Sequence, residues 1–397
     1  MRRVAGMILL LSLFLTLSGC AVLPQGSTLP PPGTLNVGVD LELSGSDAPF
    51  AQDALRGMRL AVDAVNGAGG VLGYRLHLVV EDNAGSPDGA ALAATKLIHD
   101  YGVVAILGPL ASSDAQAVAP LADRARVPVI FPSATDPSLT SGGRGPLPYV
   151  FRACFTADYQ GALAAAFARH RLGGGSGVFV LAERGSQYSK ELADSFGQHL
   201  TALGGRLAGT AEFAPTRTDF RPLLRQALAA HAGMIYLPLY SAQAVAVIRQ
   251  AAGLGYRGDF LGPNAWDNSN WAGLGSLAER CFFTVQYYAG LSPAARAFSA
   301  AYTAHYHRRP DTAAALGYDA AGVLIQAMRQ AGSLDPRRVA PALAALKQDY
   351  PGATGSFRLD QRHDPRKPGA VVSWRGGRKV LRYLVPAQPA GPGGPKR

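Results

Sequence analysis

Cysteine is scarce in this chain of 397 residues, which contains only Cys20, Cys154 and Cys281. A chain of this length with so few cysteines is not a small domain held together by a disulfide framework. Cys154 and Cys281 could pair if the protein is exported to an oxidising compartment, but spacing alone does not decide this. Both the paired and the free state therefore stay open.

Signatures of catalysis are also missing. The sequence contains no phosphate-binding loop and no Gly-x-Ser-x-Gly nucleophile elbow. The histidines show no metal-ligand spacing, and His305 and His307 would point to different faces of a helix. Scattered carboxylates such as Glu81, Asp82 and Asp158 suit solvated or capping positions better than acid–base chemistry. We therefore expect no enzyme activity, no cofactor and no metal ion.

Charge is limited, because Asp, Glu, Lys and Arg make up 16% of the residues, with a net charge of +11. A basic balance could indicate nucleic acid as a partner. However, the positive residues are scattered and form no run interleaved with aromatic residues, so we expect no nucleic-acid binding. The apolar share of 48% is typical of a globular protein. The chain is long enough for two domains.

The apolar stretch at the N-terminus, Ile8 to Leu17, is too short to span a bilayer. It follows Arg2 and Arg3 and has the form of a signal peptide. It leads into Leu17-Ser18-Gly19-Cys20, which resembles the bacterial lipobox, a signal whose cysteine is lipidated. We expect a protein of the cell envelope or periplasm, anchored to a membrane through lipid on Cys20. An ordinary signal peptide with an incidental cysteine is the alternative.

From about residue 35 onward, strand-like and helix-like patterns alternate, which predicts two successive doubly wound α/β units followed by return segments. Several crossings between the two units would form a hinge. The expected strands are 35–43, 74–82, 103–107, 127–131, 149–154, 178–182, 207–213, 234–239, 281–287, 355–359, 370–374 and 379–384, and residues 260–263 are expected to form a further strand end. The expected helices are 51–66, 87–101, 158–171, 187–203, 219–230, 242–254, 293–307, 312–331 and 338–347, with one more that begins at Ser112 or Ser113 as its N-cap.

Small hydroxyl residues follow two of these strands. Ser112 and Ser113 come after Val103–Leu107, and Ser133-Ala134-Thr135 comes after Val127–Phe131. Ligands of open α/β sheets lie outside the carboxyl ends of the strands. A helix N-terminus also offers free N–H groups that suit a carboxylate. The stretch therefore predicts a cradle for a small anionic or zwitterionic ligand, unless these residues only cap a helix and form a turn.

These patterns and several short motifs occur in the order found in one known family. The motifs are Leu43-Ser44-Gly45, residues 65–73 (VNGAGGVLG), residues 80–82 (VED), residues 108–113 (GPLASS), residues 132–135 (PSAT), Phe151-Arg152, residues 158–161 (DYQG), residues 185–188 (GSQY), Gly262-Pro263, Trp266-Asp267 and residues 317–320 (GYDA). The chain from about Thr34 to Leu384 resembles the periplasmic substrate-binding proteins of branched-chain amino acid ABC transporters, the Leu/Ile/Val-binding family.

The resemblance implies a type I periplasmic binding protein fold, in which three crossover strands join two doubly wound α/β lobes around a ligand cleft. The implied divisions are a signal peptide at 1–19, a lipidated cysteine and proline-rich tether at 20–33, lobe 1 at 34–153 plus 285–352, lobe 2 at 154–284 plus 353–385, and a disordered tail at 386–397. The implied partners are a small-molecule ligand and an ABC permease of the cytoplasmic membrane. We expect the protein to be a monomer.

The resemblance also assigns ligand contacts. Ser112 and the turn Ser133-Ala134-Thr135 would hold the α-carboxylate and α-ammonium of an amino acid. Phe50 would flank the ligand from lobe 1, and Tyr188 and Tyr240 would close over it from lobe 2. Both tyrosines lie at element ends, which favours a cleft position over a core position.

One position departs from the family. Amino-acid binders usually carry an acidic residue where this chain has Asn264, and a neutral amide makes a weaker bond to an ammonium. Asp267 could substitute if its side chain points into the cleft. Otherwise the ligand is an amide, a carboxylate without an amine, or an unrelated compound.

Three functions are consistent with these features. A transport receptor would capture an aliphatic amino acid or a related amide or carboxylate by hinge closure. A regulatory lipoprotein of the same fold would sense a ligand and act on an envelope partner protein. A purely structural lipoprotein would tolerate changes at Ser112 and Thr135. The hydroxyls at Ser112, Ser133 and Thr135 favour ligand binding.

Overall fold

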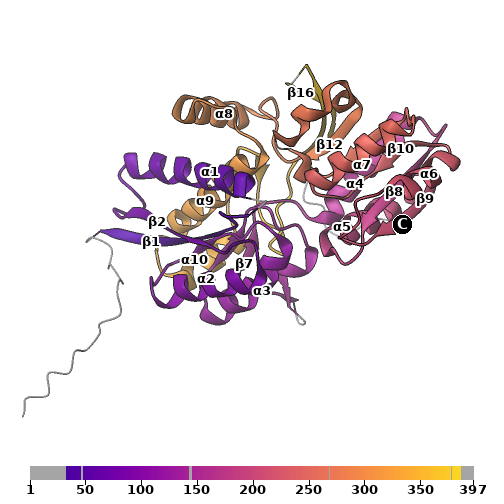
Figure 1. Cartoon of the computed structure of the whole chain (residues 1–397). Helices are drawn as coiled ribbons and strands as arrows, with labels where there is room; N and C mark the ends of the chain where they lie inside the picture. The colour runs from indigo at the N-terminus through magenta and orange to yellow at the C-terminus, as the bar shows by residue number, and fades with distance from the viewer. Residues whose placement is uncertain (1–32, 46–47, 143–144, 268, 377, 386–397) are drawn as a thin grey trace, which may run out of the picture.

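The computed structural model describes residues 33–45, 48–142, 145–267, 269–376 and 378–385. The predicted signal peptide, Cys20, almost all of the tether and the C-terminal tail lie outside these residues. The described part of the chain forms two lobes, each built on its own β-sheet (Figure 1). No helix in the described ranges is long and apolar enough to cross a membrane.

Lobe 1 contains a five-stranded parallel sheet in the order β2-β1-β3-β4-β7. Its strands are β1 (Thr34–Leu41), β2 (Arg75–Asp82), β3 (Ile106–Leu107), β4 (Val129–Phe131) and β7 (Val150–Arg152). Its helices are α1 (Ala48–Gly67), α2 (Pro87–His99), α3 (Ser112–Ala125), α8 (Pro293–Tyr306), α9 (Thr312–Ala331) and α10 (Pro336–Ala344). The apolar face of α1 packs with α9 over the sheet, as its helical spacing of apolar residues predicts.

Lobe 2 contains a seven-stranded sheet in the order β16-β15-β12-β11-β10-β8-β9, in which β15 and β16 run antiparallel to their neighbours. Its strands are β8 (Gly177–Glu183), β9 (Leu207–Phe213), β10 (Ala232–Tyr236), β11 (Asp259–Gly262), β12 (Cys281–Val285), β15 (Gly369–Arg375) and β16 (Arg378–Val385). Its helices are α4 (Ala157–Leu172), α5 (Gln187–Ala202), α6 (Arg221–Ala229) and α7 (Ser241–Gly253).

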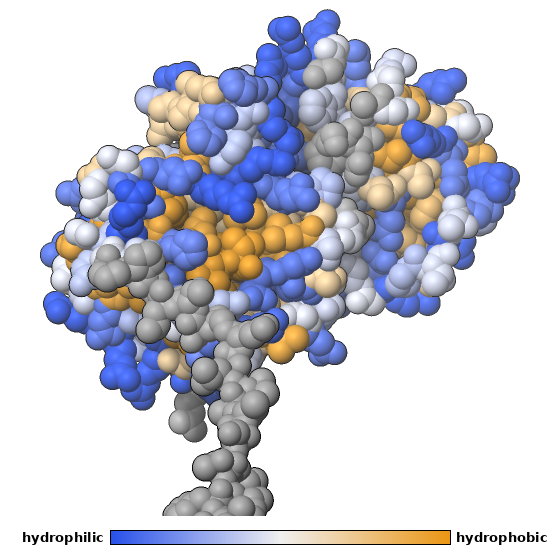
Figure 2. Space-filling model, turned by 60° about the vertical axis from the view of Figure 1, so that its left-hand side comes forward, coloured by the Kyte–Doolittle hydropathy of each residue, from blue (hydrophilic) through white to orange (hydrophobic). Residues whose placement is uncertain are grey.

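Short elements complete the described chain. They are the 3₁₀ helices η1 (Pro137–Thr140), η2 (Asn264–Trp266) and η3 (Ser269–Arg280), the small hairpin of β5 (Ser141–Gly142) and β6 (Gly145–Pro146), and the hairpin of β13 (Tyr350–Gly352) and β14 (Gly355–Phe357). Figure 2 shows that hydrophilic residues cover much of the molecular surface in that view, with a large hydrophobic area on lobe 1 and smaller hydrophobic areas elsewhere.

The chain passes between the two lobes three times, after β7, after β12 and after β14. The predicted fold class, two α/β lobes joined by three crossovers, is therefore confirmed. Most expected elements are present with shifted ends. The strand expected over 103–107 is shorter, because β3 pairs only through Ile106 and Leu107.

Two details differ from the sequence-based expectations or resolve them. Helix α3 begins at Ser112, with Ala111 as its N-cap and no side-chain capping bond, so the prediction that Ser112 or Ser113 is the N-cap is wrong. Cys154 and Cys281 are both buried and free. The thiol of Cys154 donates to the carbonyl of Ala134, and the thiol of Cys281 donates to the carbonyl of Leu277.

Candidate functional site

The lobe 1 side of the candidate site is built where the adjacent parallel strands β3 and β4 end. The Ser112 hydroxyl accepts a hydrogen bond of 3.3 Å from the N–H of Asp136, which ties the start of α3 to the turn after β4. Thr135 is 1% exposed, and its hydroxyl has no hydrogen-bond partner. Ser133 is half-buried. The structure therefore brings Ser112 and the Ser133–Thr135 turn together, as the sequence predicts.

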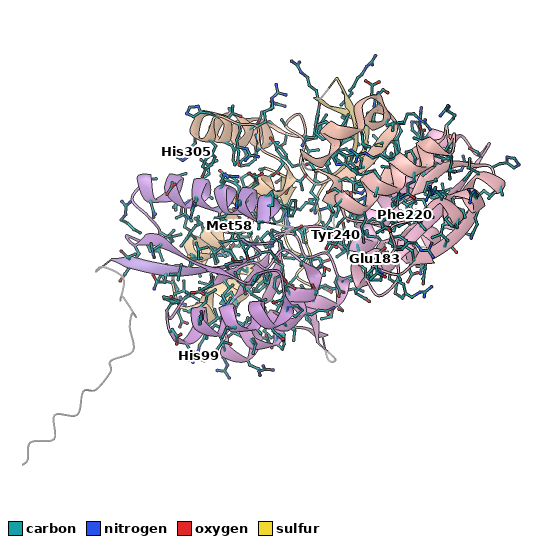
Figure 3. The ribbon with its side chains drawn as sticks, in the orientation of Figure 1. Met58, His99, Glu183, Phe220, Tyr240 and His305 are labelled. Atoms are coloured by element: carbon teal, nitrogen blue, oxygen red, sulfur yellow. The ribbon has the colours of Figure 1, made fainter. Side chains whose placement is uncertain are left out.

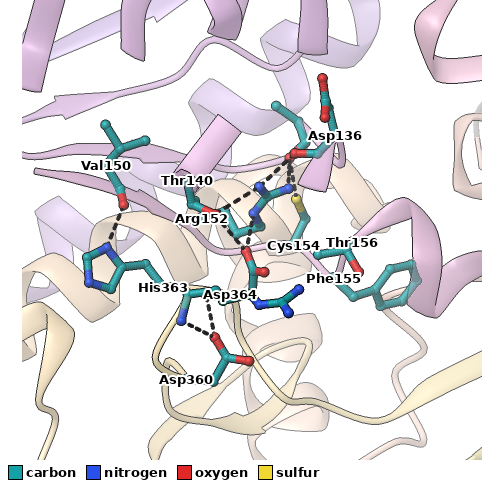
Figure 4. A network of polar contacts seen from close by, with 12 residues as sticks. Asp136, Thr140, Val150, Arg152, Cys154, Phe155, Thr156, Asp360, His363 and Asp364 are labelled. Carbon is teal, nitrogen blue, oxygen red and sulfur yellow. Dashed lines mark hydrogen bonds and ion pairs between the residues drawn. The ribbon is translucent and has the colours of Figure 1, made fainter. Parts of the chain in front are cut away.

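Arg152, at the end of β7, donates hydrogen bonds to the backbone of this turn (Figure 4). Its side chain is fully buried, and its two Nη atoms donate to the carbonyls of Ala134 (3.0 Å) and Asp136 (2.7 Å). Its Nε lies 2.6 Å from Oδ1 of Asp364, on the crossover segment after β14. The turn is therefore fixed to the hinge by one guanidinium. The sequence carried a signal for this role, a lone arginine in an apolar strand, but we assigned it none.

The lobe 2 side of the site contains Tyr188, Tyr240 and Asn264. The two tyrosine rings stack with centroids 5.1 Å apart, and the Tyr188 hydroxyl donates to Oδ1 of Asn264 at 3.4 Å. Tyr240 is 41% exposed, and Figure 3 places it in the region between the two lobes. Asn264 is buried, and Gln160 Oε1 accepts its backbone N–H at 2.7 Å. Burial raises the pKa of Tyr188, so its hydroxyl stays a neutral donor.

Phe50 and Asp267 line a cavity of about 600 Å³, and none of the other predicted site residues contributes to its walls. The remaining walls come from α1, the segment around Tyr287, Ser299 of α8, the segment 308–311 before α9 and the β15–β16 hairpin. Asp267 is buried, ion-paired with Lys379 at 2.8 Å, and accepts from the N–H (3.0 Å) and hydroxyl (2.6 Å) of Thr312. Both of its oxygens are thus already engaged.

Two acidic residues that the sequence reasoning passed over lie beneath the cradle. Glu42 accepts hydrogen bonds from the backbone N–H groups of Leu110 (3.1 Å) and Ala111 (2.9 Å), just before α3. The protein's own carboxylate therefore takes donors that we had expected to serve a ligand. Asp40 accepts from Asn83 at 2.8 Å. Burial raises the pKa of Glu42 to about 7 and that of Asp40 to about 8. The sequence pattern that could have indicated this role is the pair Asp40 and Glu42, two acidic residues at alternate positions of an apolar predicted strand.

No group of three or more His, Cys, Asp or Glu residues suited to a metal ion occurs within the described ranges. The site instead offers hydroxyls, a neutral amide and aromatic faces. Such an arrangement can recognise a small polar molecule by hydrogen bonds and ring contacts. It lies where two hinged lobes meet, which defines the class of two-lobed α/β ligand receptors.

Comparisons with known proteins place the chain more closely. The profile of the periplasmic binding protein family matches residues 34–379, and the chain belongs to this family. It is 27% identical over 332 residues to the leucine-, isoleucine-, valine-, threonine- and alanine-binding protein of Pseudomonas aeruginosa, covering 83% of this chain and 87% of that protein.

Two solved structures are similar over almost their whole length. A leucine-binding protein from Thermotoga maritima has a TM-score of 0.82 and 30% identity, with 89% of this chain and 99% of that one covered. A branched-chain amino acid transporter substrate-binding protein from Streptococcus pneumoniae, in complex with isoleucine, has a TM-score of 0.80 and 28% identity, with 89% and 99% covered. The resemblance noted in the sequence is therefore confirmed.

Proposed function

We propose that this chain is the substrate-binding protein of an ABC importer, and that it binds an aliphatic or branched-chain amino acid, or a related amide or carboxylate, between its lobes. The observation that carries the proposal is the buried, unpartnered hydroxyl of Thr135. A buried polar group without a partner costs about 1–3 kcal/mol. A ligand carboxylate beside Ser112 and Thr135 would satisfy this hydroxyl. The names of the relatives support the same ligand class.

The proposal assigns hinge motion to two bodies, residues 34–153 plus 285–352 and residues 154–284 plus 353–385. The ligand would bind to the lobe 1 hydroxyls, and Tyr188 and Tyr240 of lobe 2 would then cover it. Because the closed form has more ligand contacts, binding would shift the population toward closure. A permease would recognise the closed form and receive the ligand, with no catalytic step by this chain.

The location that fits this function is the cell envelope. We propose that lipid on Cys20 anchors a monomer to a membrane, where the tether lets it reach the permease. Incorporation of labelled fatty acid tests the anchor. Wild-type protein should carry the label and Cys20→Ser should not, whereas equal labelling of both would overturn this part of the proposal.

Calorimetric titration of the purified protein, stripped of ligand by unfolding and refolding, tests the ligand class. One pool contains aliphatic amino acids, and the other contains amides and carboxylates. Each hydrogen bond to a charged carboxylate contributes about 1.5–3 kcal/mol, so Thr135→Ala and Ser112→Ala should each weaken binding at least about tenfold. Thr303→Ala, an exposed threonine on α8, is the control. Unchanged affinity in both the Thr135→Ala and Ser112→Ala variants would exclude ligand binding at these hydroxyls. No binding to either pool would favour the ligand-sensing lipoprotein.

A further inference from the structure

Two carboxyl groups meet beside the ligand turn, one from each lobe. Asp136 directly follows Thr135 in lobe 1, and Glu191 lies on α5 of lobe 2, one helical turn after Tyr188. Helices α3 and α5 approach each other across the lobe boundary, and the side chains of Asp136 and Glu191 are within hydrogen-bonding reach. Carboxylates have only acceptors, so the two groups need a proton or a cation between them.

The protein itself supplies little to balance this pair. Gln116 Nε2 donates to Asp136 Oδ2 at 2.6 Å, and Gln187 Nε2 donates to Glu191 Oε1 at 2.6 Å. The N–H of Ser138 also donates to Asp136 Oδ1, at 2.8 Å, so all three donors are uncharged. Glu191 Oε2 is buried and has no partner.

Besides the exposed Lys190, which pairs with Asp194, the cation that acts on the charge of Glu191 is Arg152. Its guanidinium is occupied, because its Nε pairs with Asp364 and its Nη atoms donate to backbone carbonyls. A cationic group of the ligand would therefore find an open acceptor at Glu191.

We propose that Glu191 and Asp136 form the binding site for the ligand's ammonium group, and that the ligand is therefore an α-amino acid and not a bare amide or carboxylate. This inference rests on the proposed function. Because Asp136 directly follows Thr135 in the chain, the ammonium would lie near a ligand carboxylate at Thr135, as the two groups of an α-amino acid require. It also explains how the site works with a neutral Asn264 and with Asp267 held by Lys379 and Thr312.

The two acids differ in how they hold protons. Burial above all, together with the Asp136 charge, raises the pKa of Glu191 to about 7, and a hydrogen bond from Gln187 opposes this rise. Burial opposes ionisation of Asp136 too, but hydrogen bonds from Ser138 outweigh it and lower the pKa of that carboxyl. Below about pH 7 the ligand-free pair therefore keeps a proton on Glu191. An incoming ammonium would displace this proton to the buffer, leaving two carboxylates around one cation.

The experiment compares leucine with 4-methylpentanoate, which is leucine without its amine. We expect wild-type protein to bind leucine at least about tenfold more tightly, since an ion pair in a closed site outweighs a neutral contact. Glu191→Gln should weaken leucine binding about tenfold and leave 4-methylpentanoate unchanged. Asp194→Asn, on the same helix and in an exposed pair with Lys190, is the control and should bind both as wild type.

A second readout separates contact from mere support of the fold. Titration of leucine at pH 6 in two buffers of different ionisation enthalpy should show proton release by wild type and none by Glu191→Gln. Leucine binding that is equally tight in Glu191→Gln, or equally tight for both ligands in wild type, would overturn the ammonium site alone. Failure of wild type to bind either compound would overturn the amino-acid form of the proposed function, and the ammonium site with it.

Discussion

Asp267 accepts hydrogen bonds from both the backbone N–H and the hydroxyl of Thr312, at 3.0 and 2.6 Å. Asp267 follows η2 in lobe 2, whereas Thr312 begins α9 in lobe 1. The same carboxylate pairs with Lys379 at 2.8 Å. One buried acid therefore links the two lobes and neutralises a lysine of the β15–β16 hairpin. Its role is structural in this conformation, although the sequence made it a candidate ligand contact.

Asp267→Asn should lower the free energy of unfolding by about 1–3 kcal/mol, because it leaves a partly buried Lys379 without its counter-charge and weakens the bonds to Thr312. Urea unfolding followed by circular dichroism measures this loss. Asp194→Asn, which removes an exposed ion pair with Lys190, should leave the midpoint unchanged. Equal midpoints for wild type and Asp267→Asn would show that the link contributes nothing.

Arg152→Lys should affect both stability and ligand affinity. Lysine keeps the charge, but its single nitrogen cannot replace the three separate guanidinium nitrogens that contact the two carbonyls and Asp364, so we expect a loss of about 3 kcal/mol or more in unfolding free energy. The Ser133–Thr135 turn would also lose its support, and ligand binding should weaken several-fold. Unfolding and calorimetric titration measure the two effects. Arg221→Lys, in an exposed pair with Asp219, is the control, and a matching result for both variants would contradict the role of Arg152.

The sequence predicts those parts of the fold and site that depend on short stretches. Ser112 and Thr135 could be placed together because the carboxyl ends of neighbouring parallel strands share one edge of a sheet. The engagement of Asp267 could not be predicted, because Thr312 lies 45 residues away and Lys379 lies 112 residues away. The contact between Asp136 and Glu191 could not be predicted either, because the two residues are far apart in the sequence and their contact depends on how the lobes face each other.

Asp40 makes stability depend on pH. Burial raises the pKa of its carboxyl from 3.8 to about 8, so the folded protein holds a proton that the unfolded chain releases near pH 4. The folded state binds more protons between these values, and stability must therefore fall as pH rises from about 4 to about 8. One such group changes the unfolding free energy by at most about 1.4 kcal/mol per pH unit.

Asp40→Asn removes this titration while keeping an oxygen that can accept from Asn83. Urea midpoints measured between pH 5 and pH 8 should decline less steeply in the variant than in wild type. Part of the decline should persist, because burial also raises the pKa of Glu42 to about 7. Parallel pH profiles for the two proteins would show that Asp40 is ionised in the folded state.

Gly317, in the motif Gly317-Tyr318-Asp319-Ala320, allows α9 to cross α1 closely. A Cβ atom at this position would lie 2.1 Å from the carbonyl oxygen of Ala54, and the glycine on the other side, Gly57, is equally constrained by the carbonyl of Ala314. Gly317→Ala should therefore push the helices apart and lower the unfolding free energy by about 2–3 kcal/mol, despite the better helix propensity of alanine.

Gly197→Ala in α5 is the matched control, because a Cβ there meets no atom within 4 Å. It should raise the free energy by about 0.5–1 kcal/mol. The two substitutions are chemically identical, so opposite shifts in the urea midpoint would isolate the close crossing as the cause, and a stabilising effect at both positions would contradict it.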